Sequence, residues 1–145
     1  MSAFTRAGED GRLTLAVPAK GRMAEPTLRL CADAGLSFET TERSLVVPCA
    51  NAPVDLLLVR PSDIPEYVQD GVVHLGVTGA NLVVEAQADV VTLAELGFAR
   101  CTLQAAVPND SSVLAIEELD GLRVATAYPV STRMPVSSRH GAAAT

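Results

Sequence analysis

Apolar runs alternate with polar turns along most of this chain, and the spacing of the apolar positions changes several times. Three runs predict strands, Leu13–Val17, Val54–Val59 and Val72–Val77, and each precedes a polar turn and a stretch with helical spacing. Those stretches predict helices at Met23–Ala34, Ile64–Gln69 and Asn81–Ala88. Further apolar runs predict strands at Leu36–Phe38, Leu45–Val47, Val90–Leu93, Thr102–Val107 and Leu122–Thr126. Strands that alternate with helices favour an α/β fold with a parallel or mostly parallel sheet.

The helical pattern thins after Gly97, which predicts a division into two lobes. We expect a first α/β lobe over residues 13–97 and a partial second lobe over residues 98–133. Residues 1–12 are polar and we expect them to be flexible, whereas residues 134–145 lack periodicity and predict a disordered or appended tail. Apolar residues make up 48% of the chain, aromatic residues 3%, and Trp is absent, so Val, Leu and Ala must build the core. Such a core suits parallel strands covered by helices.

Charge and cysteine content exclude several classes of protein. The net charge is −6 and no face is dense in Lys and Arg, which argues against binding to nucleic acid or to an anionic membrane. Cys31, Cys49 and Cys101 are scattered without a CxxC pair, so we expect neither a disulfide framework nor a metal site. The N-terminus lacks the apolar core of a signal peptide, and no run approaches the ~20 apolar residues that span a bilayer. These features predict a soluble, cytoplasmic protein.

Two polar turns at strand ends carry cations. The turn Lys20-Gly21-Arg22 follows a strand and opens a helix, so it is either an anion seat or a surface turn with two solvated cations. Arg60 and Asp63 follow the strand Val54–Val59. Arg60 can bind a phosphate or a carboxylate while Asp63 orients it, or the two residues form a local salt bridge that caps the next helix.

Small and hydroxyl-bearing residues mark two more strand ends. Gly76, Thr78 and Gly79 offer a hydroxyl and backbone N–H groups to a phosphate or a base edge, although Thr78 can instead be an ordinary N-cap. The turn Thr126–Pro129 is of the same kind. His74 lies within a predicted strand, which favours a packed or hydrogen-bonded role over a ligand.

The chemistry that these residues permit is binding rather than covalent catalysis. No Ser/His/Asp or Cys/His set has supporting context, so the sequence identifies no nucleophile or general base. Because the carboxyl ends of parallel strands share one edge of a sheet, we expect a ligand cleft where the strands ending at Val17, Val59 and Val77 finish. Lys20, Arg60 and Thr78 are then expected to lie together.

Five segments, in order, resemble the ATP phosphoribosyltransferase family, which carries out the first step of histidine biosynthesis. The family signature Arg-x-x-Asp-Ile-Pro-x-Tyr-Val is matched in full by Arg60–Val68, and the segment Ala-Thr-x-Tyr-Pro by Ala125–Pro129. The family's Lys/Gly/Arg turn, its Gly-x-x-Asp-Leu-Gly-Ile-Thr-Gly-x-Asp segment and its Leu-Gly-Phe-Gly-x-Cys segment are resembled by Ala16–Met23, Gly71–Asn81 and Leu96–Cys101. The likeness covers residues 13–133.

The chain departs from the family pattern in places. His74 and Asn81 stand where acidic residues are common, and Ala99 replaces a usual Gly. Members of the family continue past the Tyr-Pro turn to an acidic, Gly/Thr-containing loop that holds the ribose and 5-phosphate of phosphoribosyl pyrophosphate. Nothing in this sequence resembles that loop, and residues 134–145 do not resemble the family. We therefore expect an N-terminal fragment, a truncated gene product or a frame-shifted end, inactive by itself.

The resemblance implies a two-lobed, periplasmic-binding-protein-like (type II) α/β fold with its second lobe incomplete and its active site in the cleft. It implies transfer of phosphoribose from phosphoribosyl pyrophosphate to N1 of ATP, with Mg²⁺ bound to the substrate phosphates and no metal held by the protein alone. Homo-oligomers, or hetero-oligomers with a regulatory subunit, are expected. The alternative is a non-catalytic nucleotide- or anion-binding module, or a subunit of a larger assembly.

The resemblance also implies a role for each candidate residue. Lys20, Gly21, Arg22 and Arg60 would hold polyphosphate, and Asp63 would orient Arg60. Gly76, Thr78 and Gly79 would line the nucleotide site, and Thr126 and Tyr128 would border the cleft from the second lobe.

Overall fold

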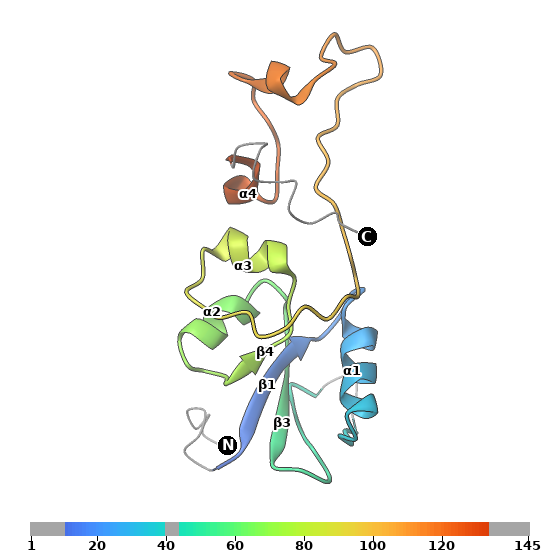
Figure 1. The fold of residues 1–145 in the computed structure, drawn as a ribbon, viewed down its shortest axis with the longest axis vertical. Coiled ribbons are helices and arrows are strands. Elements are labelled where there is room, and N and C mark those ends of the chain that lie inside the picture. Colours follow the sequence, from blue (N-terminus) through green and yellow to red (C-terminus); the bar gives the residue numbers. More distant parts are fainter. Residues whose placement is uncertain (1–10, 40–43, 134–145) are drawn as a thin grey trace. The chain divides into compact units, whose positions relative to one another are not determined.

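The computed structural model describes residues 11–39 and 44–133 of the chain. Its contacts divide the chain into two compact units, one ending at Ala99 and the other beginning at Arg100. The first unit holds a four-stranded sheet, and the described part of the second holds two short helical segments (Figure 1). The expectations for residues 1–10 and 134–145 lie outside the described residues.

The sheet of the first unit is mostly parallel, as the sequence predicts. Its strand order is β2-β3-β1-β4, with β1 (Leu13–Pro18) in parallel pairing with both β3 (Val54–Val59) and β4 (Leu75–Gly76). The short β2 (Val46–Pro48) pairs with β3 in the antiparallel sense. The carboxyl ends of β3, β1 and β4 therefore meet at one edge of the sheet.

One face of the sheet packs against α2 (Ile64–Gln69). Ala16 of β1 and Leu57 of β3 lie on this face, buried together with Ile64 and Val73. The helix has the predicted bounds, because Pro65 suits its first turn and Gly71 follows its end with a positive φ of 69°. The next helix, α3 (Ala80–Ala86), packs against α2.

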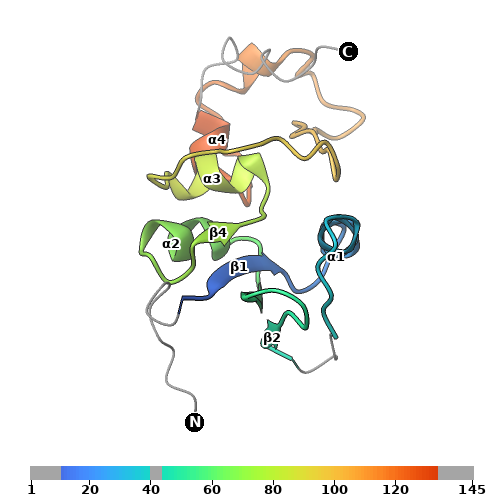
Figure 2. The ribbon, with the colours of Figure 1, turned by 60° about the horizontal axis from the view of Figure 1, so that its bottom comes forward.

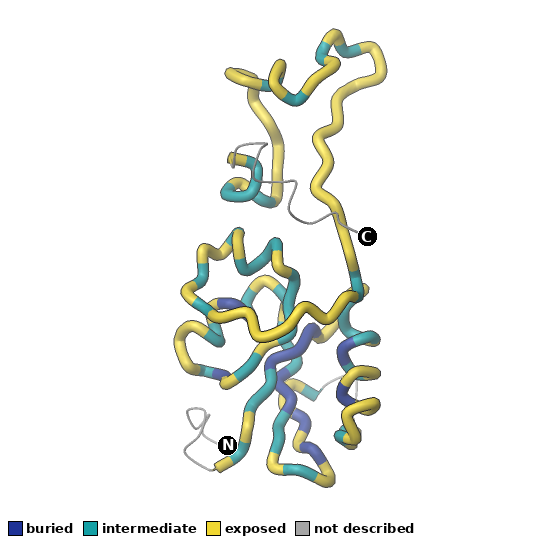
Figure 3. The backbone as a smooth tube through the Cα atoms, viewed as in Figure 1, coloured by how far each residue is buried: buried dark blue, intermediate teal, exposed yellow. Residues whose placement is uncertain are grey.

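The other face packs against α1 (Ala24–Asp33), on the opposite side of the sheet from α2 (Figures 1 and 2). Val17 and Leu56 are buried here with Val47 and Cys31. Because adjacent positions of β1 and β3 point to opposite faces, both strands are apolar throughout their middle. The buried residues lie mainly in these strands, in α1 and around the start of α2 (Figure 3).

An ion pair fastens the amino ends of the two central strands. The Arg12 guanidinium donates from Nε and Nη2 to the two carboxylate oxygens of Asp55, at 2.9 and 2.7 Å, and from Nη2 to the Val54 carbonyl at 3.2 Å. This two-point contact is stronger than a single surface pair because its geometry is fixed. It holds β1 in register with β3 at the edge opposite the candidate site.

Several predicted strands are shorter than expected or wrong. Leu36–Phe38 contributes only an isolated bridge between Phe38 and Cys49. Residues 88–99 contain no strand, so the strand expected at Val90–Leu93 is wrong. The segment instead crosses from α2, where Gln69 Oε1 accepts the Asp89 N–H at 2.9 Å, to the outer side of α1, where Phe98 lies.

The second unit has little regular structure in its described residues. It contains a 3-10 turn at Ile116–Leu119 and a five-residue helix, α4 (Pro129–Arg133). The strands expected at Thr102–Val107 and Leu122–Thr126 are wrong: these segments have no hydrogen-bonded neighbour strand in the part of the chain that the structure describes. A strand needs such a neighbour, however suitable its apolar pattern.

No helix among residues 11–39 and 44–133 is long and apolar enough to span a bilayer.

Candidate functional site

The three polar turns of the first unit lie together at the carboxyl edge of the sheet. The Ala19 N–H, just beyond β1, donates to the Val59 carbonyl at the end of β3 at 2.8 Å. The Val77 N–H, just beyond β4, donates to the Ala16 carbonyl of β1 at 2.9 Å. The turns that carry Lys20, Arg60 and Thr78 are thus brought to one edge, as the sequence predicts.

Thr78 joins two of these turns directly. Its half-buried hydroxyl donates to the carbonyl of Pro61 at 2.7 Å. The N-cap of α3 is Gly79 and carries no side-chain cap, so the alternative role of Thr78 as an ordinary N-cap is wrong. The turn after β4 is instead tied to the turn after β3.

The three cations at this edge have exposed side chains. The side chains of Lys20, Arg22 and Arg60 make no hydrogen bond or ion pair within the described residues. Cations without a protein counter-ion next to backbone N–H groups form an arrangement that attracts anions.

Asp63 differs from both sequence-based interpretations. The structure shows no ion pair between Asp63 and Arg60, and Asp63 makes no side-chain cap on α2. Its carboxylate accepts the neighbouring Ser62 hydroxyl at 3.1 Å, and its N–H closes the turn by donating to the Arg60 carbonyl at 3.0 Å. Asp63 therefore contributes to this turn through its backbone N–H and through the bond from Ser62.

The glycines of the candidate site differ in what would oppose a larger residue: backbone conformation in one case and close contacts in the others. Gly21 has a φ of 90°, a conformation that other residues rarely adopt, in the turn before α1. A Cβ on Gly76 would overlap Ile64 and crowd Val68, so Gly76 lets α2 pack onto β4. A Cβ on Gly79 would lie 2.5 Å from Asn81 Oδ1. Close packing inside the protein thus explains Gly76 without a ligand.

The remaining two predicted site residues belong to the second unit. The Tyr128 N–H donates to the Thr126 hydroxyl at 2.9 Å, and the Tyr128 carbonyl accepts the Thr132 hydroxyl at 2.7 Å. These bonds fold the Thr126–Pro129 turn onto the start of α4. Their role in a cleft stays a prediction.

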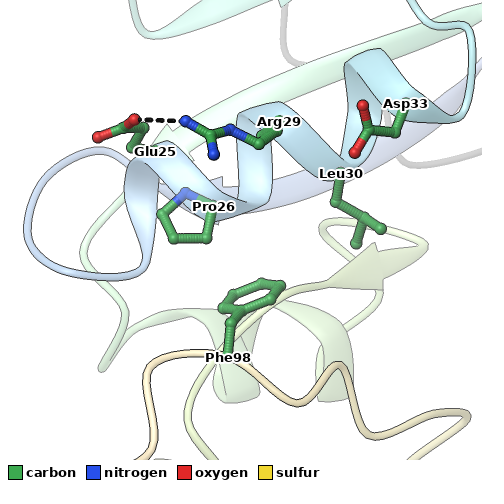
Figure 4. A pocket seen from close by; sticks show the side chains of 6 residues that line it. All are labelled: Glu25, Pro26, Arg29, Leu30, Asp33 and Phe98. Atoms are coloured by element: carbon green, nitrogen blue, oxygen red, sulfur yellow. Dashed lines mark hydrogen bonds and ion pairs between the residues drawn. The ribbon is translucent and has the colours of Figure 1, made fainter.

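A hollow of about 370 Å³ lies beside α1 and was not anticipated from the sequence. The Phe98 ring faces Pro26 and Leu30, while Arg29 is paired with Glu25 at 3.0 Å (Figure 4). The spacing of Pro26, Arg29 and Leu30 indicates that they share one face of the helix. Only the fold shows that Phe98 lies against that face. Because the charge of Arg29 is already neutralised by Glu25, this hollow is a poorer anion site than the carboxyl edge of the sheet.

Two of the thiols are buried outside the candidate site. Burial raises the pKa of the Cys31 thiol above its usual value, and the neighbouring Cys49 adds to that rise. The Cys49 thiol lies 3.0 Å from Asn51 Oδ1. A protonated, buried thiol is a poor nucleophile, so Cys31 behaves as a core residue.

His74 has the hydrogen-bonded role that the sequence favours. Its Nδ1 accepts the backbone N–H of Thr14 at 2.9 Å and so joins the start of β4 to β1. We expect His74→Ala to lower the free energy of unfolding in urea by about 0.5–1.5 kcal/mol, because Thr14 loses its acceptor. His74→Asp should lose less, since a carboxylate oxygen can accept the same N–H. Equal losses in the two variants would contradict this role.

The chain is similar to known proteins of one family. A family model described as "HisG: ATP phosphoribosyltransferase" matches residues 60–144, more than half of the chain. The chain belongs to this family. An ATP phosphoribosyltransferase of Methanopyrus kandleri is 44% identical over 118 residues, which are 81% of this chain and 42% of that one. That of Methanosarcina barkeri is 39% identical over 131 residues, 89% of this chain and 45% of that one. That of Bacteroides fragilis is 40% identical over 117 residues, 81% of this chain and 41% of that one.

The extent of the match corrects one expectation. The ATP phosphoribosyltransferase match reaches residue 144, so the family likeness extends into residues 134–145, where we expected none. The chain spans less than half the length of these curated relatives. A solved "ATP phosphoribosyl transferase (HisG:HisZ) complex from Thermotoga maritima" is similar with a TM-score of 0.47 and 29% identity, over 55% of this chain and 37% of that one.

Proposed function

We propose that this chain supplies the nucleotide- and polyphosphate-binding part of an ATP phosphoribosyltransferase, the enzyme of the first step of histidine biosynthesis. The observation that carries the proposal is the edge of the sheet in the first unit. There the family signature at Arg60–Val68 begins beside the Lys20–Arg22 turn and is tied to Thr78. Three cations that have no counter-ion among the described residues lie at one edge and fit a substrate with several phosphates.

The proposed reaction needs positioning and charge neutralisation more than a protein nucleophile. N1 of ATP attacks C1 of the ribose in phosphoribosyl pyrophosphate, the N1–C1 bond forms, and the bond from C1 to the pyrophosphate oxygen breaks. Pyrophosphate leaves with the bonding electron pair. Lys20, Arg22 and Arg60 would compensate the phosphate charge, and the Gly21 and Gly79 backbones would allow close approach.

Mg²⁺ would enter this site with the substrate phosphates. The ion prefers oxygen ligands and is commonly held by one or two carboxylates together with phosphates. Asp63 is the carboxylate in these three turns, and its side chain is engaged only by the Ser62 hydroxyl among the described residues. The donor chemistry therefore fits a phosphate-bound Mg²⁺. When bound, the ion would supply further neutralisation of phosphate charge.

We also propose the finer architecture and setting that the family likeness implies. The full protein would have the two-lobed type II fold, with Thr126 and Tyr128 on the second lobe, and would act in the cytoplasm. It would assemble with copies of itself or with a regulatory subunit.

A non-catalytic nucleotide- or anion-binding module is the second candidate. The scarcity of regular structure in the described part of the second unit favours it, because a two-substrate enzyme needs both lobes formed. Both candidate functions include the anion site, but only the first includes transfer of phosphoribose to ATP.

Calorimetric titration of the 145-residue chain tests the shared site. We expect ATP and inorganic pyrophosphate to bind at least tenfold more tightly than adenosine, because the phosphates meet the three cations. Affinity should fall as salt rises, since exposed charges are screened. Equal affinity for adenosine and ATP, or no binding of pyrophosphate at millimolar concentration, would overturn the proposal.

A further inference from the structure

We infer that Thr78 is a positioning residue, which fixes the turn of Arg60 through the Pro61 carbonyl and does not itself bind the substrate phosphates. The inference rests on the proposed function, because it concerns how the polyphosphate site is held in shape. It differs from the role that the family resemblance implies for Thr78, which is to line the nucleotide site.

The bond from Thr78 joins strands that are not neighbours. Pro61 follows β3 and Thr78 follows β4, while β1 lies between these two strands in the sheet. The 2.7 Å hydrogen bond between them therefore spans 17 positions of sequence and links the outer two of the three turns. Sheet pairing alone does not fix the distance between these turns.

The Arg60 backbone is held on both sides of its peptide link to Pro61. The Arg60 carbonyl accepts the Asp63 N–H at 3.0 Å, and the next carbonyl, that of Pro61, accepts the Thr78 hydroxyl. The proline ring restricts the backbone between these two bonds. The base of the Arg60 side chain is thus fixed, while its guanidinium is exposed and makes no ion pair within the described residues.

The single hydroxyl proton of Thr78 decides between positioning and direct contact. A threonine hydroxyl donates one hydrogen bond, and here the Pro61 carbonyl accepts it. Phosphate oxygens need donors. While Thr78 holds Pro61, its side chain has no second proton to offer a phosphate, so we expect its effect on anion binding to pass through the turn.

A double-mutant cycle on the full chain tests this role, with inorganic pyrophosphate as the probe in calorimetry. We expect Thr78→Val to weaken binding about three- to tenfold, the range that one neutral hydrogen bond commands. Thr78→Ser should bind within about twofold of the natural chain, because it keeps the hydroxyl. In an Arg60→Ala background Thr78→Val should have no further effect, since the side chain that it positions is gone.

Thr92→Val is the matched control, because Thr92 is exposed and makes no hydrogen bond within the described residues. All titrations are made at a temperature where circular dichroism shows each variant folded. An unchanged affinity in folded Thr78→Val, or the same loss with and without Arg60, would overturn the positioning role alone. If Arg60→Ala leaves pyrophosphate binding unchanged, the Arg60 assignment of the proposed function fails and the positioning role falls with it.

Discussion

A purified polypeptide of these 145 residues is expected to form no measurable phosphoribosyl-ATP from ATP, phosphoribosyl pyrophosphate and Mg²⁺. The chain spans 41–45% of the three relatives described above, and the described residues of its second unit form no sheet that could grip the second substrate. Without that grip the two reactants are not held together, and the proximity contribution lost is about 7–11 kcal/mol of the barrier. A steady-state assay that follows phosphoribosyl-ATP measures the effect.

A chimera distinguishes two reasons for inactivity: the remainder of the enzyme is absent, or the site has been assigned incorrectly. Residues 13–133 replace the matching part of the Methanosarcina barkeri relative, which supplies the remainder of the enzyme. We expect this chimera to transfer phosphoribose, since the relative then completes the candidate site at the carboxyl edge of the sheet. Turnover of the isolated chain in the usual range of about 1–10³ per second would contradict the first expectation. A folded but inactive chimera would contradict the proposed function.

Arg60→Ala is expected to weaken pyrophosphate binding about 10- to 100-fold. A charge-assisted contact contributes about 1.5–3 kcal/mol, and the Arg60 side chain is exposed at the strand edge with no ion pair in the described residues. Calorimetric titration of the full chain measures the loss. The same titration with ATP should show a loss in the same direction, because the polyphosphate is the shared group.

Arg29→Ala is the matched control for Arg60. Arg29 lies on α1, its side chain is 71% exposed, and it is paired with Glu25 at 3.0 Å. A surface pair of this kind contributes about 0–1 kcal/mol to stability, and it offers little to an anion elsewhere. The same loss of affinity in both variants would show that general charge, and not the strand-edge site, attracts the ligand.

Local signals in the sequence predicted the part of the fold that carries the candidate site. The run Val54–Val59 is β3, and Pro65 with Gly71 set the bounds of α2. The meeting of the three turns at one edge followed from the predicted parallel order of the strands. These features depend on residues close in sequence or on a general rule of parallel sheets.

What the sequence could not predict depends on partners distant in the chain. The apolar patterns at Thr102–Val107 and Leu122–Thr126 are suitable for strands, but neither segment has a neighbour strand in the described structure. The hydroxyl of Thr78 has its acceptor in Pro61, and no local pattern indicates that partner. Asp63 lies three positions from Arg60 and yet makes no ion pair with it; its N–H donates to the Arg60 carbonyl, and its carboxylate accepts the Ser62 hydroxyl.

One departure from the family pattern places a residue other than glycine in a strained backbone conformation. Ala99, at a position where Gly is usual, has a φ of 54°. This left-handed conformation strains a residue with a Cβ, by roughly 1–2 kcal/mol. The backbone thus keeps the shape that the usual glycine would allow, although the side chain opposes it.

β1 lies between β3 and β4 in the sheet, and from this position we expect a particular order of folding in the first unit. β2 and β3 are joined by the short connection Cys49–Pro53 and can pair early, because closing a short loop costs little entropy. The contacts that fasten β1, Arg12 with Asp55 and Thr14 with His74, join residues 43 and 60 positions apart. Such distant pairings form slowly, so β1 is expected to enter the sheet after the hairpin. The candidate site is expected to form only with that step, because β1 lies between β3 and β4, whose turns contribute to it.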